Sequence, residues 1–188
     1  MNLYLLRHTQ PDVAPGICYG QTDLGLAASF DAELQRIRAG LAGLHIDHVH
    51  SSPLQRCHRL AAALAAGKVH QDPRLMELDF GEWELQPWQA IPRGLVEVWT
   101  EDYVRRAPPG GESFFDLQQR VIGFFDEVSA NNQDLLVVTH AGVIRALLAH
   151  ALNMQLLDAF RLRVDYGSLS QLELQDGRVT VSAVNRRF

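Results

Sequence analysis

The stretch LYLLRHTQ, residues 3–10, decides how this chain folds. Its apolar half, residues 3–6, is typical of a strand that is buried on both faces, as in a parallel sheet covered by helices. The runs IDHVHS (46–51) and LLVVT (135–139) have the same character. The first run stops abruptly at the polar triplet Arg-His-Thr (7–9), and the other two also lead into polar residues. If the three strands are neighbours, these polar residues gather at one edge of the sheet.

Helical patterns occupy the intervals between these runs. The expected helices are residues 30–44, 52–66, 112–130 and 141–152. In the second, Ser52 followed by Pro53 is typical of a helix start with a serine cap. Residues 168–184 alternate around Asp176-Gly177, which indicates a hairpin. This order of strands and helices predicts an α/β domain with a mostly parallel sheet between layers of helices.

The composition limits the partners and the setting of the protein. A chain of 188 residues suits a single domain over 1–188 with a sizeable core. The net charge of -5 argues against nucleic acid or an acidic membrane as the main partner. Cys18 and Cys57 form no paired pattern, and we see no signal peptide and no apolar run of bilayer length. We therefore expect a cytoplasmic protein in a reducing compartment, and the sequence does not indicate its oligomeric state.

Residues 72–113 interrupt the alternation of strands and helices. This segment is long and rich in Pro, Gly and Trp. Long irregular segments are often lids or binding loops, although a surface excursion with one or two short helices fits equally well. We expect the segment to lie over the active site, with Trp83, Trp88 and Trp99 anchoring it rather than lining a substrate cleft.

The polar residues at the strand ends suggest a phosphate site, because ligands of open α/β sheets bind beyond the carboxyl ends of the strands. The clusters are Arg7-His8-Thr9, Ser51-Ser52-Pro53 with Arg56 one turn into the next helix, and His140-Ala141-Gly142. Arg7 and Arg56 have planar donor forks that suit phosphate oxygens, and N–H groups at the helix start near Ala141 add further donors. Together with the rings of His8 and His140 they describe a pocket for a tetrahedral dianion. No P-loop glycine pattern indicates a nucleoside triphosphate.

Cleavage of a phosphate monoester needs more than binding, because enzymes have to accelerate it by factors approaching ~10²¹. A nucleophile, surrounding cations and a proton donor are the usual parts. Neutral His8 can attack phosphorus if a hydrogen bond fixes its tautomer, although the sequence does not name the bonding partner. Glu77 and Glu82, both in LMELDFGEWE, are candidates for the acid that protonates the leaving oxygen.

Two other classes of protein could use some of these residues. A non-catalytic module that binds a phosphorylated ligand needs the same pocket, but the retained Glu77 argues against it. A metallohydrolase could use His45, His48, His50 and His70, of which the second and third share a strand face. No HExxH or Cys-His set accompanies them, so surface histidines are the favoured interpretation.

The order of these residues resembles the histidine phosphatase (phosphoglycerate mutase-like) superfamily. The similar stretches are Arg7-His8-Thr9, SSPLQRCHRLA (51–61), LMELDFGEWE (75–84), PPGGES (108–113) and VVTHAGVIRALL (137–148), in chain order from Leu3 to about Leu148. The resemblance implies a three-layer α/β/α sandwich with a mostly parallel central sheet, a small phosphorylated substrate, and neither a metal nor another cofactor.

The resemblance also assigns roles to residues of this sequence. It implies that His8 accepts the phosphoryl group as a phosphohistidine and that Glu77, rather than Glu82, is the proton donor. The phosphoryl oxygens would be held by Arg7, Arg56 and His140. 

The chain departs from the family pattern at two positions. Ala14 stands where the mutases usually carry Asn, and the mutases have a larger insertion, so a phosphatase is favoured over a mutase. Leu85 replaces the glycine of the family's Trp-Glu-Gly, which leaves the backbone conformation there open. A broad-specificity phosphatase of sugar phosphates or phosphoglycerate would have the same catalytic residues and remains an alternative.

The stretch RHTQPDVAPGICYGQTDLGL (7–26) is similar to the N-terminal part of the α-ribazole phosphatases within this superfamily. Those enzymes remove the 5′-phosphate of α-ribazole phosphate, or of its cobamide form, late in cobalamin biosynthesis. The resemblance implies that the loop of residues 16–21 lies over the pocket, where Tyr19 could stack on a flat base and Gln21 could bond the phosphate or the ribose. Equally, Tyr19 could merely pack the loop.

Overall fold

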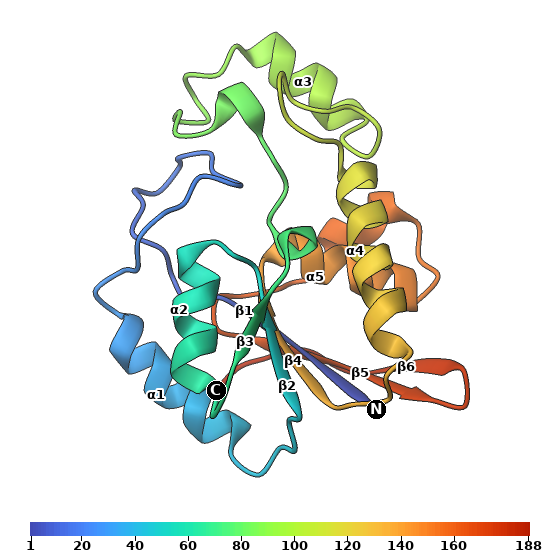
Figure 1. Cartoon of the computed structure of the whole chain (residues 1–188). Coiled ribbons are helices and arrows are strands. Elements are labelled where there is room, and N and C mark those ends of the chain that lie inside the picture. The colour runs from blue at the N-terminus through green and yellow to red at the C-terminus, as the bar shows by residue number, and fades with distance from the viewer.

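The computed structural model describes all residues, 1–188, and is built around a 6-stranded sheet (Figure 1). The strands are β1 (Asn2–Arg7), β2 (His48–Ser51), β3 (Val69–Gln71), β4 (Leu135–Thr139), β5 (Leu169–Gln175) and β6 (Arg178–Arg186). Their order is β3-β2-β4-β1-β5-β6. β3, β2, β4 and β1 are parallel, whereas β5 and β6 are antiparallel additions beside β1. The predicted mostly parallel sheet is confirmed, and β2, β4 and β1 are direct neighbours.

Helices cover both faces of the sheet, which confirms the expected α/β/α sandwich (Figure 1). The α-helices are α1 (Phe30–Leu41), α2 (Gln55–Leu64), α3 (Arg93–Glu101), α4 (Phe114–Ser129) and α5 (Ala141–Ala151), and short 3-10 helices are η1 (Pro73–Leu75), η2 (Gly81–Trp83) and η3 (Leu156–Arg161). α1 and α2 pack on one face, and α4 and α5 pack on the other. No helix is long and apolar enough to cross a membrane.

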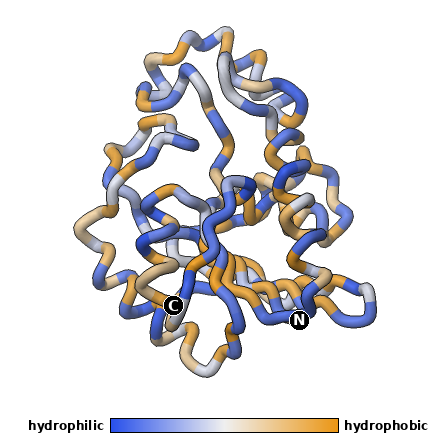
Figure 2. The backbone as a smooth tube through the Cα atoms, in the orientation of Figure 1, coloured by the Kyte–Doolittle hydropathy of each residue, from blue (hydrophilic) through white to orange (hydrophobic).

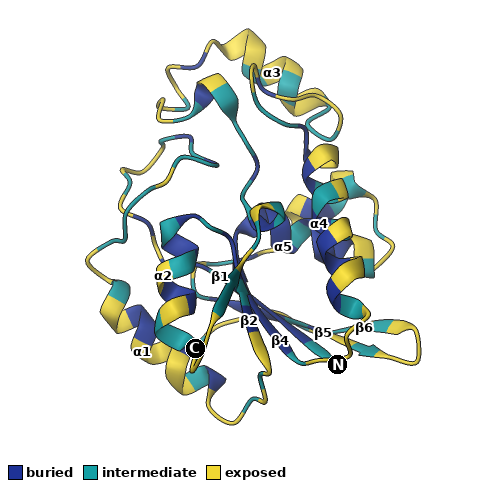
Figure 3. Ribbon diagram, viewed as in Figure 1, coloured by how far each residue is buried: buried dark blue, intermediate teal, exposed yellow.

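The side chains of β1 alternate between two hydrophobic cores. Leu3 and Leu5 belong to the core beneath α4 and α5, while Tyr4 and Leu6 belong to the core beneath α1 and α2. All four are buried. The central strands generally are buried (Figure 3) and hydrophobic (Figure 2). Burying a leucine contributes about 1.5–3 kcal/mol, so both helical layers hold this strand in place. The continuous apolar run in the sequence follows from this two-sided burial.

The segment 72–113 rises above the carboxyl ends of the parallel strands and includes α3 (Figure 1). Trp83 and Ile91 of this segment form a small core together with Cys18. The ring centres of Trp83 and Trp99 are 5.7 Å apart, and those of Trp88 and Trp99 are 6.3 Å apart. The tryptophans therefore pack on one another, as expected of residues that anchor the segment.

Two local predictions have different outcomes. The hairpin is confirmed, because Asp176 and Gly177 both have positive φ, at 51° and 73°, between β5 and β6. The predicted start of the second helix at Ser52-Pro53 is wrong, since α2 begins at Gln55 and Leu54 occupies the N-cap without a side-chain hydrogen bond. The hydroxyl of Ser52 points instead to a histidine ring, described below.

Candidate active site

His8 continues β1 and lies at the centre of the polar cluster. The backbone N–H of His8 donates to the carbonyl oxygen of Thr139 at 3.0 Å, and the backbone carbonyl of His8 accepts from the N–H of Gly167 at 3.1 Å. The imidazole is buried, and Nδ1 lies 2.7 Å from the carbonyl oxygen of Thr9. Because a carbonyl can only accept, Nδ1 carries the proton and Nε2 has a free lone pair. Thr9 is thus the bonding partner that the sequence could not name.

The electrostatic surroundings keep His8 neutral. Burial lowers the pKa of His8 well below its ordinary value, and the positive charges of Arg7 and Arg56 lower it further. The bond to the Thr9 carbonyl acts in the opposite direction but does not reverse the shift. A neutral imidazole with a free Nε2 has the form that a nucleophile requires.

His140 lies beside His8 at the N-cap of α5. The centres of the two rings are 5.0 Å apart, and Nε2 of His140 is 2.9 Å from the hydroxyl of Ser52. Cys57 also contacts this ring, with Sγ 3.4 Å from Nε2. The ring is fully buried, and burial followed by the charge of Arg56 lowers the pKa of His140 well below its ordinary value.

Arg7 and Arg56 are cations without a carboxylate partner, since neither takes part in an ion pair. Arg56 is fully buried; Nη1 donates to the carbonyl of Thr22 at 2.8 Å and Nη2 to the carbonyl of Gly20. Arg7 donates to the carbonyl of Val164 at 2.7 Å. The Nε atoms of both arginines are buried without a partner. Charges and donors that the protein leaves uncompensated favour the binding of an anion.

Glu77 approaches the first turn of α5, where Gly142 N donates to Oε1 at 3.1 Å and to Oε2 at 3.2 Å. Leu78 N also donates to Oε1 at 3.0 Å. The structure therefore brings Glu77 to the helix that begins directly after His140. Glu82, the other candidate acid, is exposed, and its backbone is attached to Pro109 instead.

The backbone of Glu77 is held by a residue that the sequence did not single out. Arg120 of α4 donates from Nη2 to the Glu77 carbonyl at 3.0 Å and from Nη1 to the Met76 carbonyl at 2.7 Å. Glu112 pairs with the same guanidinium at 2.5 Å. PPGGES supplies Glu112, but nothing in the helical pattern of 112–130 distinguishes Arg120 from a solvated arginine.

Glu84, which belongs to the segment 72–113, binds the loop of residues 16–21 and the residue that follows it, Thr22. Its carboxylate accepts from Gln21 N at 2.8 Å and from Thr22 N at 2.6 Å. Burial alone raises the pKa of Glu84, but hydrogen bonds, chiefly from Thr22, outweigh burial and hold it below the ordinary value. The next residue, Leu85, has φ of 64°, and its N–H donates to the Cys18 carbonyl at 2.8 Å. The left-handed conformation that suits glycine is therefore present here with leucine.

The remaining expected binding residues have mixed positions. The side-chain amide of Gln21 donates to the Glu77 carbonyl at 3.1 Å, so it supports the backbone of Glu77 in this structure. Ala141 is the buried first residue of α5, where N–H groups have no partner within the helix. Tyr19 lies at the cluster, with its hydroxyl 2.5 Å from that of Tyr166. Tyr166 was missed, because it lies in a turn between η3 and β5 that has no distinguishing pattern.

The histidines considered as metal ligands lie elsewhere. His50 and His70 stack across β2 and β3 with ring centres 5.2 Å apart, and His48 is 5.9 Å from His70. No group of three or more His, Cys, Asp or Glu side chains has an arrangement that could hold a metal ion. 

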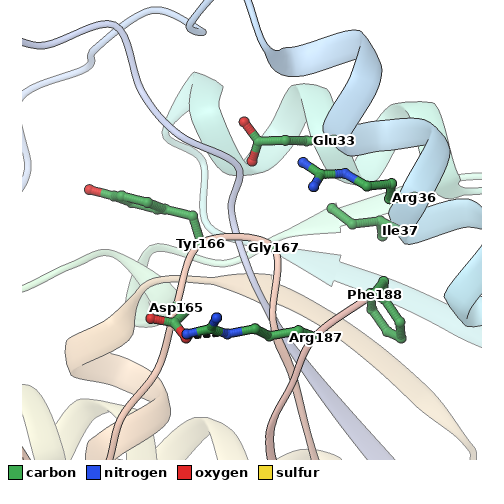
Figure 4. Close-up of a pocket in the computed structure, with 8 residues that line it drawn as sticks. All are labelled: Glu33, Arg36, Ile37, Asp165, Tyr166, Gly167, Arg187 and Phe188. Carbon is green, nitrogen blue, oxygen red and sulfur yellow. Dashed lines mark hydrogen bonds and ion pairs between the residues drawn. The ribbon is translucent and has the colours of Figure 1, made fainter.

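A cavity of about 330 Å³ adjoins the cluster at Tyr166 (Figure 4). It is lined by Glu33, Arg36, Ile37, Asp165, Tyr166, Gly167, Arg187 and Phe188. Neither His8 nor His140 lines it, and the side chain of Tyr166 points away from Phe188 (Figure 4). A larger cavity of about 570 Å³ lies at the opposite, amino end of β2 and β3.

Known proteins are similar to this chain in sequence and in fold. The family model described as the histidine phosphatase superfamily (branch 1) matches residues 3–187. The adenosylcobalamin/alpha-ribazole phosphatase of Salmonella typhimurium is 29% identical over 197 residues, which cover 100% of this chain and 97% of that protein. The alpha-ribazole phosphatase of Shigella flexneri has a crystal structure that superposes with a TM-score of 0.92 at 28% identity, covering 100% and 97% of the two chains. A mycobacterial glucosyl-3-phosphoglycerate phosphatase superposes with a TM-score of 0.88 at 26% identity, covering 98% of each.

The chain belongs to the histidine phosphatase superfamily. Like the phosphatases that it matches over 97% of their length, it is a hydrolase of phosphate esters. The resemblance inferred from the sequence is thus confirmed.

Proposed function

We propose that this phosphatase hydrolyses α-ribazole 5′-phosphate, or the cobamide that carries the same 5′-phosphate, through a phosphohistidine on His8. The tautomer of His8 carries the proposal. Thr9 holds the proton on Nδ1, so Nε2 is free to attack, and two arginines without carboxylate partners flank the ring. Arg7, Arg56, His140 and the N–H of Ala141 hold the phosphoryl oxygens and stabilise the charge of the transition state.

The proposed reaction has two steps. In the first, Nε2 of His8 bonds to phosphorus and the bond from phosphorus to the 5′-oxygen breaks, while protonated Glu77 gives its proton to that oxygen. In the second, the ionised Glu77 takes a proton from water as the water oxygen bonds to phosphorus and the nitrogen–phosphorus bond breaks. Inorganic phosphate leaves, and neutral His8 and protonated Glu77 are restored.

The position of residues 72–113 supports a lid role within a single domain of residues 1–188. The segment contributes Glu77 to the start of α5 and Glu84 to the loop that Arg56 binds. We propose that it shields the reaction from bulk water once substrate is bound.

The choice of substrate is supported by the loop of residues 16–21. This loop resembles that of α-ribazole phosphatases in sequence, and the main chain at Gly20 contacts the Arg56 guanidinium directly. Tyr19 therefore lies next to the phosphate site, where a flat base on the leaving group could meet it. The second candidate is a broader phosphatase of sugar phosphates or phosphoglycerates, which the similarity to the glucosyl-3-phosphoglycerate phosphatase favours.

Phosphate release from α-ribazole 5′-phosphate, measured beside glucosyl-3-phosphoglycerate and common sugar phosphates, tests the substrate. We expect kcat/KM to be at least about tenfold higher for the ribazole ester, which corresponds to about 1.4 kcal/mol of transition-state binding. Comparable values across the panel would overturn the substrate assignment and leave the second candidate.

Variants test the assigned roles. His8→Ala should abolish turnover and the trapping of radiolabelled phosphate on the protein, and near-normal rates would overturn the mechanism. Glu77→Gln should slow esters with poor leaving groups about 10²–10⁴-fold and an activated aryl phosphate much less. Glu82→Gln, at the exposed neighbouring acid, is the matched control and should be silent. An equal loss for both classes of ester in Glu77→Gln would contradict the role of proton donor.

A further inference from the structure

Each arginine of the phosphate site lies against a tyrosine. The Cζ atom of Arg7 is 3.7 Å from the centre of the Tyr166 ring, and Cζ of Arg56 is 5.6 Å from the centre of the Tyr19 ring. The Tyr166 ring is also 5.5 Å from the ring of His8. Tyr166 therefore lies beside both Arg7 and the proposed nucleophile, and Tyr19 lies beside Arg56.

The two tyrosines meet at their hydroxyl groups, whose oxygens are 2.5 Å apart. They come from segments 147 residues apart in the sequence, so the contact joins two sides of the site. Burial raises the pKa of the Tyr19 hydroxyl, and the bond to Tyr166 raises it further. Tyr19 therefore keeps its proton near neutral pH.

We propose that Tyr19 and Tyr166 form a gate across the entrance of the phosphate site, and that the leaving group of an ester has to break their hydrogen bond to bring its phosphorus to His8. This inference rests on the role of His8 proposed above. In this proposal inorganic phosphate, which carries no substituent, binds with the pair closed, whereas the substituent of an ester has to pass out between the two rings. The gate then sets which phosphate esters reach the nucleophile, favouring those with a flat group that the parted rings can hold.

The main chain on both sides of the gate is fixed, so side-chain rotation opens it. Beside Tyr166, the N–H of Gly167 donates to the His8 carbonyl at 3.1 Å. Gly167 has φ of 65°, and a β-carbon there would lie 3.3 Å from Ile37, so this turn requires glycine after Tyr166. Beside Tyr19, the N–H of Cys18 donates to the Gln86 carbonyl at 2.9 Å.

The cavity of about 330 Å³ next to Tyr166 provides the space for the open position (Figure 4). The Tyr166 ring points away from the apolar side chains of Ile37 and Phe188 that line this cavity (Figure 4). A change of side-chain rotamer would move the ring off Arg7 and toward them. The exposed fraction of Tyr166, 38%, shows that its outer side already meets solvent.

The test compares Tyr19→Phe, Tyr166→Phe and the double variant, which retain both rings and lose the hydrogen bond. We expect kcat/KM for a bulky aryl ester, 1-naphthyl phosphate, to rise about two- to tenfold, the range for one net hydrogen bond. The inhibition constant of inorganic phosphate should not change, because a ligand that fits the open and closed states equally does not shift them. The double variant should equal each single variant, since all three lose the same bond.

Tyr103→Phe is the matched control. The Tyr103 hydroxyl donates to the Leu157 carbonyl, outside the site. Its loss should change neither kcat/KM for the aryl ester nor the inhibition constant of phosphate. A fall in kcat/KM, additive effects of the two substitutions, or an equal change in phosphate inhibition would overturn the gate. His8→Ala separates this result from the mechanism: if that variant is inactive while the phenylalanine variants match the unmodified protein, only the gate is wrong. If His8→Ala still hydrolyses the aryl ester, the proposed chemistry is wrong.

Discussion

Gly142 lies so close to Glu77 that residue 142 has no room for a side chain. A β-carbon there would lie much closer to Oε1 of Glu77 than van der Waals contact allows. The same Oε1 accepts the Gly142 N–H. The position of the proposed proton donor therefore depends on the absence of a side chain at the start of α5.

Gly142→Ala should consequently displace the Glu77 carboxylate and slow turnover. We expect kcat for an alkyl phosphate to fall about 10²-fold, the order expected for a displacement near 1 Å, with a smaller loss for 4-nitrophenyl phosphate. Gly123→Ala is the control, because a β-carbon on this residue of α4 meets nothing within 4 Å. An unchanged rate in Gly142→Ala would show that the contact does not position the acid.

Leu85→Gly should stabilise the protein. A left-handed backbone costs a residue with a β-carbon about 1–2 kcal/mol, whereas glycine costs about 0.5–1 kcal/mol in extra chain entropy. Little buried surface is lost, because Leu85 is 57% exposed. We expect the free energy of unfolding, measured with urea, to rise by up to about 1 kcal/mol. Leu95→Gly, at an exposed leucine within helix α3, should instead lose about 1 kcal/mol.

Acid should destabilise the protein through its two buried histidines. The pKa values of His8 and His140 lie well below the ordinary 6.5 in the folded state, so below that pH the unfolded chain binds more protons. Stability is therefore fully present above pH 6.5 and falls as the pH decreases toward the folded pKa values, by up to about 1.4 kcal/mol per pH unit for each histidine.

Urea unfolding as a function of pH checks this expectation. His140→Asn should have a shallower loss of stability below pH 6.5 than the unmodified protein. His150→Asn changes an exposed histidine on the same helix and should retain the full slope. If stability falls equally steeply with pH in all three proteins, the buried ring of His140 does not contribute to the pH dependence of stability.

Phosphate should stabilise the folded protein through Arg56. A ligand that binds only the folded state at 100 times its Kd adds about 2.7 kcal/mol, because unfolding requires its release. We expect inorganic phosphate to raise the melting temperature of the unmodified protein and of Arg93→Met, whose arginine side chain is 90% exposed. In Arg56→Met the increase should disappear, and an undiminished increase would place the anion elsewhere.

Much of this fold follows from local patterns, because burial on two sides leaves a continuous apolar run such as residues 3–6. The gathering of Arg7, Arg56 and His140 also follows, since parallel strands bring their carboxyl ends to one edge. The predicted helix start at Ser52 is wrong because the Ser52 hydroxyl lies 2.9 Å from the His140 ring and accepts only a longer bond, 3.4 Å, from Leu54 N, so the helix begins later, at Gln55. Arg120 and Tyr166 act through partners distant in sequence, which no local spacing encodes.

The antiparallel pairing of β5 with β1 affects how the chain folds during its synthesis on the ribosome. Leu3 pairs with Leu172, and the carbonyl of His8 accepts from the Gly167 N–H, so β1 lacks this partner until residues 167–172 have been synthesised. Until then one side of β1 is an unsatisfied edge, the kind of surface on which nascent chains associate wrongly. Pairing between segments so far apart in the sequence slows folding.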